Sequence, residues 1–267
     1  MNQNLSFKES LSEWLLARCL GKRPRTQEFY RDVFNIMLRA WPKADVPTAD
    51  ICADMVLTFA QSVAHHCPSR WNTIVAALRY ITPHGQKVPR RRLNIRQFTP
   101  PTQAQFAALL AECDRMPRTK AGLVIRFLSF TGLRISEARA LTWSNVAVDQ
   151  IYVPAEVTKS GKARAVPLLP GLQEVLDRLR ALDSAGYVLP RQNPRKAIEQ
   201  ASRRTFGVQW SFHCFRHLFA TRCIESLVDL PTVARWLGHQ DGGALLARTY
   251  FHLVDAHSQA MAAKVRI

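Results

Sequence analysis

The sequence predicts a mainly α-helical protein with a small antiparallel sheet, divided into an all-helical N-terminal domain and a larger α+β domain. Apolar residues recur with helical spacing over most of the chain, and short alternating runs interrupt them between residues 151 and 168. A basic stretch at 84–99 separates the two parts. Apolar residues make up 47% of the 267, which is enough to bury the core of one large domain or two small ones.

Four helices are expected in the N-terminal domain, residues 1–83. Ser6 and Glu9 have the spacing of a capping box before the first apolar-periodic stretch, which Gly21 can end. The other three helices are expected over about 26–40, about 50–65, and from residue 69 to just before Pro83. These patterns indicate a small helical module.

Residues 84–99 are interpreted as an interdomain linker, because the stretch combines several cations with nearby prolines and no acid. A solvated loop is the alternative to a DNA contact here. In so basic a chain, contact with DNA phosphates is the favoured interpretation for Lys87, Arg90, Arg91 and Arg92.

The second domain, residues 100–267, is expected to combine helices with three short strands. The strands are expected at 151–153, 155–158 and 164–168, with Ser160 and Gly161 as the hairpin turn between the last two. Helices are expected near 102–113, 119–130, 135–141, 171–182, 194–206, 214–227, 231–237, 244–250 and 255–264.

The strong positive charge indicates a nucleic-acid partner. Lys and Arg number 37 against 20 Asp and Glu, for a net charge of +17, and the excess is spread over both domains. Uninterrupted apolar stretches are much shorter than the ~20 residues of a membrane span. The first nine residues do not resemble a secretory signal, so a cytoplasmic protein without a membrane partner is expected.

The six cysteines are scattered, with no CxxC pair, and most lie in apolar helical patterns. They are predicted to be buried free thiols in a reducing compartment.

Candidate groups for phosphodiester chemistry occur in the second domain. Such chemistry needs cations on the non-bridging oxygens, a nucleophile, and a proton donor for the departing alkoxide. Arg134 lies in a turn between two helices, with Glu137 one helical turn further on, although such a pair is often only a surface ion pair. His213 and Arg216 share one face at the start of a helix and can converge on one phosphate.

Zinc is the competing interpretation of the histidines. His213 and His217 have the i, i+4 spacing of HExxH, but Cys214 occupies the position of the catalytic glutamate. No metal or other cofactor is therefore expected, and His217 is expected to pack or form hydrogen bonds inside the domain.

The full ordered series carries more information than any one residue: Arg134, Lys159, His213, Arg216, His239 and Tyr250. With it the sequence resembles the tyrosine recombinase, or phage integrase, family. The resemblance lies in five motifs in family order and covers residues 100–267. They read TGLRISEARALTW, TKSGKARAVPL, HCFRHLFATRCIE, VARWLGH and TYFH.

The resemblance implies that Tyr250 is the nucleophile, which attacks the scissile phosphate and leaves a 3′-phosphotyrosyl link and a free 5′-hydroxyl. Arg134 and Arg216 would clamp the non-bridging oxygens. Because the bond energy is kept in the protein link, neither metal nor ATP would be needed.

The remaining roles are also implied by the resemblance. Lys159 would be the general acid for the 5′-oxygen. Lys162 and Arg164 are adjacent alternatives for this role, although contact with backbone phosphates is the favoured interpretation for both. His213 would assist proton transfer at Tyr250, and His239 would hydrogen bond the phosphate.

As a whole, the resemblance implies a site-specific recombinase that acts in DNA integration, excision or inversion through a Holliday junction. The N-terminal module would be the core-binding domain, closing a C-shaped clamp on double-stranded DNA, and no arm-binding domain is expected. The resemblance also implies a homotetramer on DNA and a monomer off DNA. An accessory DNA-bending protein is a further possible partner that it implies. Asp241, Gly242 and Gly243 make the connection between His239 and Tyr250 slightly longer than in the commonest family pattern.

Two alternatives remain. A type IB topoisomerase uses the same tyrosine chemistry to relax supercoils, whereas a recombinase pairs two sites in a tetramer, to which a C-terminal helix at 255–264 is suited. A catalytically inactive DNA-binding protein is the second alternative, although a binder has no need of the complete set of reactive residues.

Overall fold

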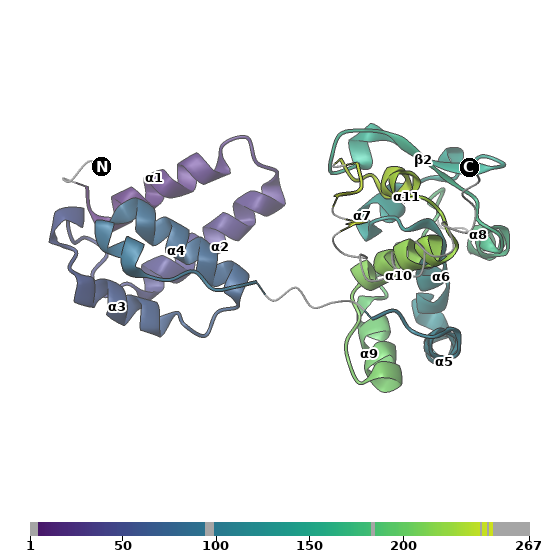
Figure 1. Ribbon diagram of the computed structural model, residues 1–267, viewed down its shortest axis with the longest axis horizontal. Helices are drawn as coiled ribbons and strands as arrows, with labels where there is room; N and C mark the ends of the chain where they lie inside the picture. The colour runs from purple at the N-terminus through teal and green to yellow at the C-terminus, as the bar shows by residue number, and fades with distance from the viewer. Residues whose placement is uncertain (1–4, 94–98, 183–184, 241, 245, 248–267) are drawn as a thin grey trace, which may run out of the picture. The chain divides into compact units, whose positions relative to one another are not determined.

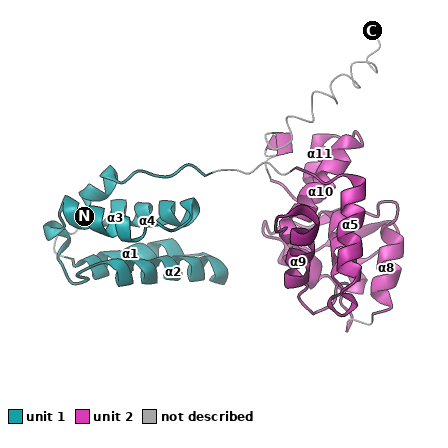
Figure 2. Ribbon diagram, turned by 90° about the horizontal axis from the view of Figure 1, so that it is seen from below, with its two compact units in different colours: residues 1–96 teal, residues 97–267 magenta. Residues whose placement is uncertain are grey.

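The computed structural model of the protein describes residues 5–93, 99–182, 185–240, 242–244 and 246–247 (Figure 1). The chain divides into two compact units, Met1–Arg96 and Gln97–Ile267, each with its own apolar core (Figure 2). Helices dominate both units, and the second contains a two-stranded antiparallel sheet, as the predicted fold class requires. Among the described helices, none has both the length and the apolar character needed to cross a membrane.

The described residues of the first unit form four α-helices around a core rich in aromatic residues. The capping box at Ser6 is confirmed: the Ser6 hydroxyl accepts the Glu9 N–H at 3.2 Å, and the Glu9 carboxylate accepts the Ser6 N–H at 2.8 Å. The helix expected over 50–65 is shorter, because Ile51 and Cys52 are extended between a 3-10 turn and α3. The elements are α1 (Phe7–Cys19), α2 (Pro24–Ala40), η1 (Thr48–Asp50), α3 (Ala53–Ser62), α4 (Pro68–Ile81) and η2 (Pro83–Lys87).

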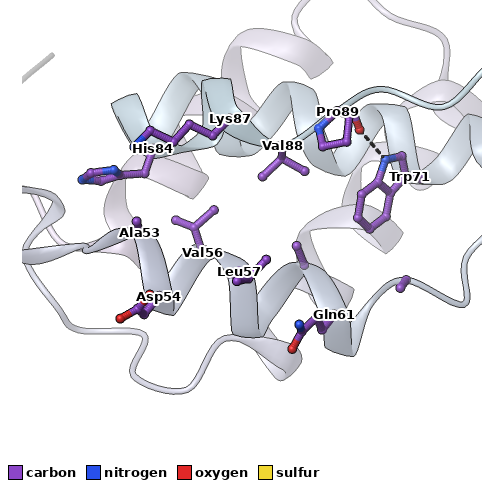
Figure 3. A pocket seen from close by; sticks show the side chains of 12 residues that line it. Ala53, Asp54, Val56, Leu57, Gln61, Trp71, His84, Lys87, Val88 and Pro89 are labelled. Carbon is purple, nitrogen blue, oxygen red and sulfur yellow. Dashed lines mark hydrogen bonds between the residues drawn. The ribbon is translucent and has the colours of Figure 1, made fainter.

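The first part of the expected linker packs on this unit. Val88 is buried in its core, and the indole Nε1 of Trp71 donates a hydrogen bond to the Pro89 carbonyl at 2.9 Å. The side chain of Asn72 binds both the carbonyl and the N–H of Arg91, at 2.9 and 2.8 Å. Figure 3 shows the resulting pocket of about 390 Å³ between α3 and residues 84–89. Residues 84–91 are thus held by the first unit and do not form an open linker.

Arg91 is also anchored on the first unit. Its guanidinium lies 4.1 Å from the centre of the Trp71 ring and donates to the carbonyls of Ala64 and His66 at 2.8 and 3.0 Å. These contacts hold the Arg91 guanidinium against the first unit, and its contact with DNA phosphates stays a prediction. Lys87, Arg90 and Arg92 are exposed.

The second unit is built around α6, which is buried along most of its length and packs against α5, α8 and α10 (Figure 1). Thr102 caps α5 with a second capping box. The α-helices and strands are α5 (Gln103–Asp114), α6 (Ala121–Thr131), α7 (Ile135–Ala140), β1 (Gln150–Val153), β2 (Arg164–Pro167), α8 (Leu172–Arg180), α9 (Arg195–Phe206), α10 (Phe212–Glu225) and α11 (Leu230–Leu237). Three 3-10 turns, η3 (Pro117–Thr119), η4 (Trp143–Asn145) and η5 (Ala155–Val157), connect them.

The sheet differs from the prediction in one strand. β1 pairs directly with β2, with Gln150 opposite Pro167 and Val153 opposite Arg164. The strand expected at 155–158 is wrong: this segment is the 3-10 turn η5, and the Thr158 hydroxyl closes it by donating to the Ala155 carbonyl at 2.9 Å. Ser160 and Gly161 therefore lie in a long connection between β1 and β2, not in a tight hairpin turn.

The cysteines are free thiols, as expected, but they are not all buried. Burial raises the pKa of Cys113 and Cys223 to about 12, which keeps both thiols protonated at neutral pH. Cys52 and Cys67 are exposed, and they occupy the N-cap positions of α3 and α4. The prediction of burial is wrong for these two residues.

Candidate active site

The turn between α6 and α7 places Arg134 at the edge of the site. Gly132 ends α6 with a φ of 62°, and a Cβ there would lie 2.4 Å from the Phe219 ring, so only glycine fits the turn. Arg134 then caps α7, and its N–H and Nη1 donate to the carboxylate of Glu137 at 3.0 and 2.9 Å. The Arg134 side chain keeps 28% of its surface exposed, whereas Glu137 is fully buried. Arg134 is thus held by the buried Glu137, while part of its side chain remains exposed.

Arg216 comes from α10 and joins two helix ends. Its Nη1 donates to the Gly132 carbonyl at 2.8 Å, and its Nη2 donates to the Leu237 carbonyl at 2.6 Å. These carbonyls belong to the last turns of α6 and α11, where backbone acceptors lack helical partners. Only 3% of Arg216 is exposed. Its position is therefore fixed by the backbone of both helices, which sequence patterns do not reveal.

Arg164 lies deeper than expected. It donates to both carboxylate oxygens of Glu137, at 2.6 and 3.4 Å, and through Nε to the Trp236 carbonyl at 2.8 Å. Only 6% of its side chain is exposed, so these partners hold the Arg164 guanidinium inside the protein. The strand pattern contained a signal for this burial. Arg164 and the buried Val166 are two residues apart on β2, so their side chains lie on the same face of the strand.

The charge of Glu137 is set by these two arginines. Burial acts to raise the pKa of Glu137, but hydrogen bonds and charge from Arg164, together with the hydrogen bonds from Arg134, outweigh it and lower the pKa below its ordinary value. Glu137 is therefore an anion at neutral pH.

Two histidines meet on the first turns of α10. The rings of His213 and His217 are 4.8 Å apart and nearly perpendicular. Burial, followed by the charges of Arg216 and Arg134, lowers the pKa of His213 below 6.5, so its ring is neutral at pH 7 and can accept a proton. His213 lies at the surface of the site, while His217 is half-buried beneath it.

We expect His217 to make the protein sensitive to acid. Burial, then His213, Arg216 and His239, lowers the pKa of His217 to about 4. Since the folded-state pKa is the lower one, the stabilising contribution of neutral His217 is complete above pH 6.5 and is lost as the pH falls from 6.5 to about 4. Solvent screening of the partly exposed ring keeps the loss in free energy of unfolding below the ~3 kcal/mol that the full shift would give. Urea unfolding between pH 7.5 and 4.5 measures this loss. His217→Gln should reduce the pH dependence and the exposed control His65→Gln should not; equal slopes in all three proteins would contradict the assignment.

His239 and the connection between β1 and β2, which carries Lys159 and Lys162, meet at a basic pocket. Gly238 ends α11 with a φ of 69°, and the following residue, His239, lines a pocket of about 250 Å³ together with Ser160, Lys162 and Arg164. Lys159 is exposed on the same connection, next to Ser160. Among the described residues, no three His, Cys, Asp or Glu side chains gather in a group that could hold a metal.

The structure thus brings Arg134, His213 and Arg216 together and places His239 and Lys162 at the adjoining pocket. Tyr250 lies outside the described residues, as do most of the expected 244–250 helix and all of the 255–264 helix. Sequence reasoning missed the carbonyls of Gly132, Trp236 and Leu237 that hold the buried guanidinium groups.

Residues 101–257 match the Phage integrase family, and the chain belongs to this family. It is 32% identical to an integrase of Escherichia phage 186 over 160 residues, 58% of this chain and 46% of the relative. It is 29% identical to tyrosine recombinase XerA of Pyrococcus furiosus over 129 residues, 44% of this chain and 45% of the relative. The chain spans about half the length of the curated relatives it matches.

Two solved structures show the same fold. One is a lambda integrase fragment in a dimer bound to a COC' core site, with a TM-score of 0.72, 17% identity, and coverage of 89% of this chain and 96% of that chain. The other is a lambda integrase tetramer bound to a Holliday junction, with a TM-score of 0.74, 17% identity, and coverage of 91% and 80%.

Proposed function

We propose that this protein is a site-specific DNA recombinase that cleaves and rejoins strands through a 3′-phosphotyrosyl intermediate. The observation that carries the proposal is the meeting of Arg134, Arg216 and a neutral His213 in one site, beside a basic pocket. Two rigidly held guanidinium groups suit the extra negative charge of a phosphoryl transition state. Family membership and the position of Tyr250 in the TYFH motif supply the nucleophile.

The proposed cleavage step begins at the Tyr250 hydroxyl. The Tyr250 hydroxyl transfers its proton to His213, and its oxygen forms a bond to phosphorus. The bond from phosphorus to the 5′-oxygen breaks, and that oxygen takes a proton from Lys159. In the rejoining step the 5′-hydroxyl of another strand gives its proton to Lys159 and its oxygen bonds to phosphorus. The bond from phosphorus to the Tyr250 oxygen breaks, and that oxygen takes its proton back from His213, so no ATP is consumed. The arginines supply the charge that a metal would otherwise provide.

The proposed substrate is a double-stranded recombination site, bound by a homotetramer that forms on DNA and dissociates to monomers off it. Both the charge of +17 and the solved lambda integrase tetramer on a Holliday junction support this proposal. The exposed cations Lys87, Arg90, Arg92 and Lys162 are proposed to contact phosphates, and His239 to hydrogen bond the scissile one. The first unit would serve as the core-binding domain. The protein would act in the cytoplasm.

The test uses duplexes that carry the DNA flanking the gene, with EDTA and without ATP. A nicked duplex should trap a protease-sensitive protein–DNA adduct, and two intact sites should exchange strands through a junction intermediate. Relaxation of supercoiled plasmid without exchange would favour the topoisomerase alternative. Binding with neither adduct nor exchange would favour the inactive DNA-binding protein.

A further inference from the structure

We propose that Arg164 is a positioning residue that shares Glu137 with Arg134, and thereby keeps the Arg134 guanidinium directed at the scissile phosphate. The proposal rests on the proposed function, in which Arg134 clamps that phosphate. In this role Arg164, whose side chain is buried at β2, affects the reaction without contacting DNA.

Glu137 is surrounded by donors from two elements. Its Oε1 accepts from Nη1 of Arg134 at 2.9 Å and from Nη1 of Arg164 at 3.4 Å. Its Oε2 accepts from the Arg134 N–H at 3.0 Å and from Nη2 of Arg164 at 2.6 Å. The bond to Arg164 Nη2 is the shortest of the four, so Arg164 takes one oxygen of the carboxylate most strongly.

This sharing limits how Arg134 can bind Glu137. Among the described residues, the Arg134 side chain donates only to Glu137 and uses only Nη1 for it. An arginine and a carboxylate prefer two parallel hydrogen bonds when nothing competes. Without Arg164, the buried carboxylate would lose two of the four hydrogen bonds that it accepts. A second nitrogen of the Arg134 guanidinium would then bind it. The arginine would then turn away from the phosphate.

Arg164 also reaches the segment that carries His239. Its Nε binds the Trp236 carbonyl at 2.8 Å, next to the Leu237 carbonyl that Arg216 binds. A Cβ on Gly238 would lie only 3.0 Å from the Arg164 guanidinium, which shows how closely the end of α11 packs on it. One side chain therefore connects Glu137, and through it Arg134, to the end of α11, which precedes His239.

The experiment separates positioning from phosphate contact. Each phosphate contact that is lost should make the plot of log affinity against log salt less steep by ~0.9. Arg164→Met should leave DNA affinity and this slope unchanged within about twofold, yet slow single-turnover cleavage at saturating protein by ~100-fold. The control Lys162→Met, at an exposed position, should weaken binding and reduce the slope.

A double-mutant cycle tests the route through Glu137. In a Glu137→Gln background, Arg164→Met should cause much less further loss of cleavage than in the native protein, because the shared carboxylate is already gone. Arg164→Lys keeps the charge with fewer donors and should restore part of the rate; it also decides the question if Arg164→Met does not fold, as judged by thermal unfolding.

Two results would overturn the positioning role: a reduced salt slope for the Arg164 variants like that of Lys162→Met, or fully additive losses in the cycle. If the unmodified protein binds DNA but never forms an adduct, the proposed function fails instead. The salt slope still reports in that case whether Arg164 touches phosphate, so the two failures can be told apart.

Discussion

Tyr250→Phe is expected to abolish the covalent protein–DNA adduct while DNA affinity stays within about twofold of the unmodified protein. Phenylalanine keeps the ring but removes the oxygen that would bond to phosphorus, and no other step of the proposed reaction can replace that bond. A nicked duplex that releases a short fragment after cleavage traps the intermediate, and a denaturing gel with and without protease measures it. The loss should be complete within detection.

The matched control for this prediction is Tyr152→Phe. Tyr152 is a half-exposed tyrosine on β1, outside the proposed chemistry, and its variant should form the adduct at the normal rate. Persistence of the adduct in Tyr250→Phe would show that another residue is the nucleophile. Loss in both variants would point to a general effect on the protein, and the binding measurement would reveal it.

Lys159→Ala is expected to lose ~10²- to 10⁴-fold in cleavage of ordinary DNA, the usual contribution of a positioned general acid. The departing 5′-alkoxide is a poor leaving group without a proton. Sulfur in the 5′-bridging position leaves readily without one, so Lys159→Ala should cleave the sulfur substrate at close to the normal rate. Single-turnover rates on the two substrates, at saturating protein, measure the effect.

Lys162→Ala is the control, because Lys162 lies three residues away on the same connection and is also exposed. Its loss of cleavage should come from weaker DNA binding, so it should appear below saturation, largely disappear at saturating protein, and be the same on both substrates. If Lys159→Ala is equally impaired on both substrates while its binding is intact, the proton donor is elsewhere, and Lys162 becomes the next candidate.

Local features of the sequence determined most of the helices and the first part of the site. Ser6 with Glu9 and Thr102 with Gln105 begin helices through contacts three residues apart, and Gly238 ends one by its positive φ. Arg134 and Glu137 are likewise one helical turn apart, so their pairing could be anticipated. The expected strand at 155–158 failed because so short an apolar run has no reliable periodicity, and Pro154 begins a 3-10 turn there.

Only the tertiary structure decided what the cations of this basic chain do. Arg91 is expected to contact phosphate because it lies in a basic stretch, and Arg164 because of the family resemblance. The structure shows that Arg91 reaches Ala64, 27 residues away, and that Arg164 reaches Glu137, also 27 residues away. The physical reason is that a charged group can be buried only where acceptors compensate its lost hydration. Those acceptors are backbone carbonyls and a carboxylate that folding brings together, and no local pattern records them.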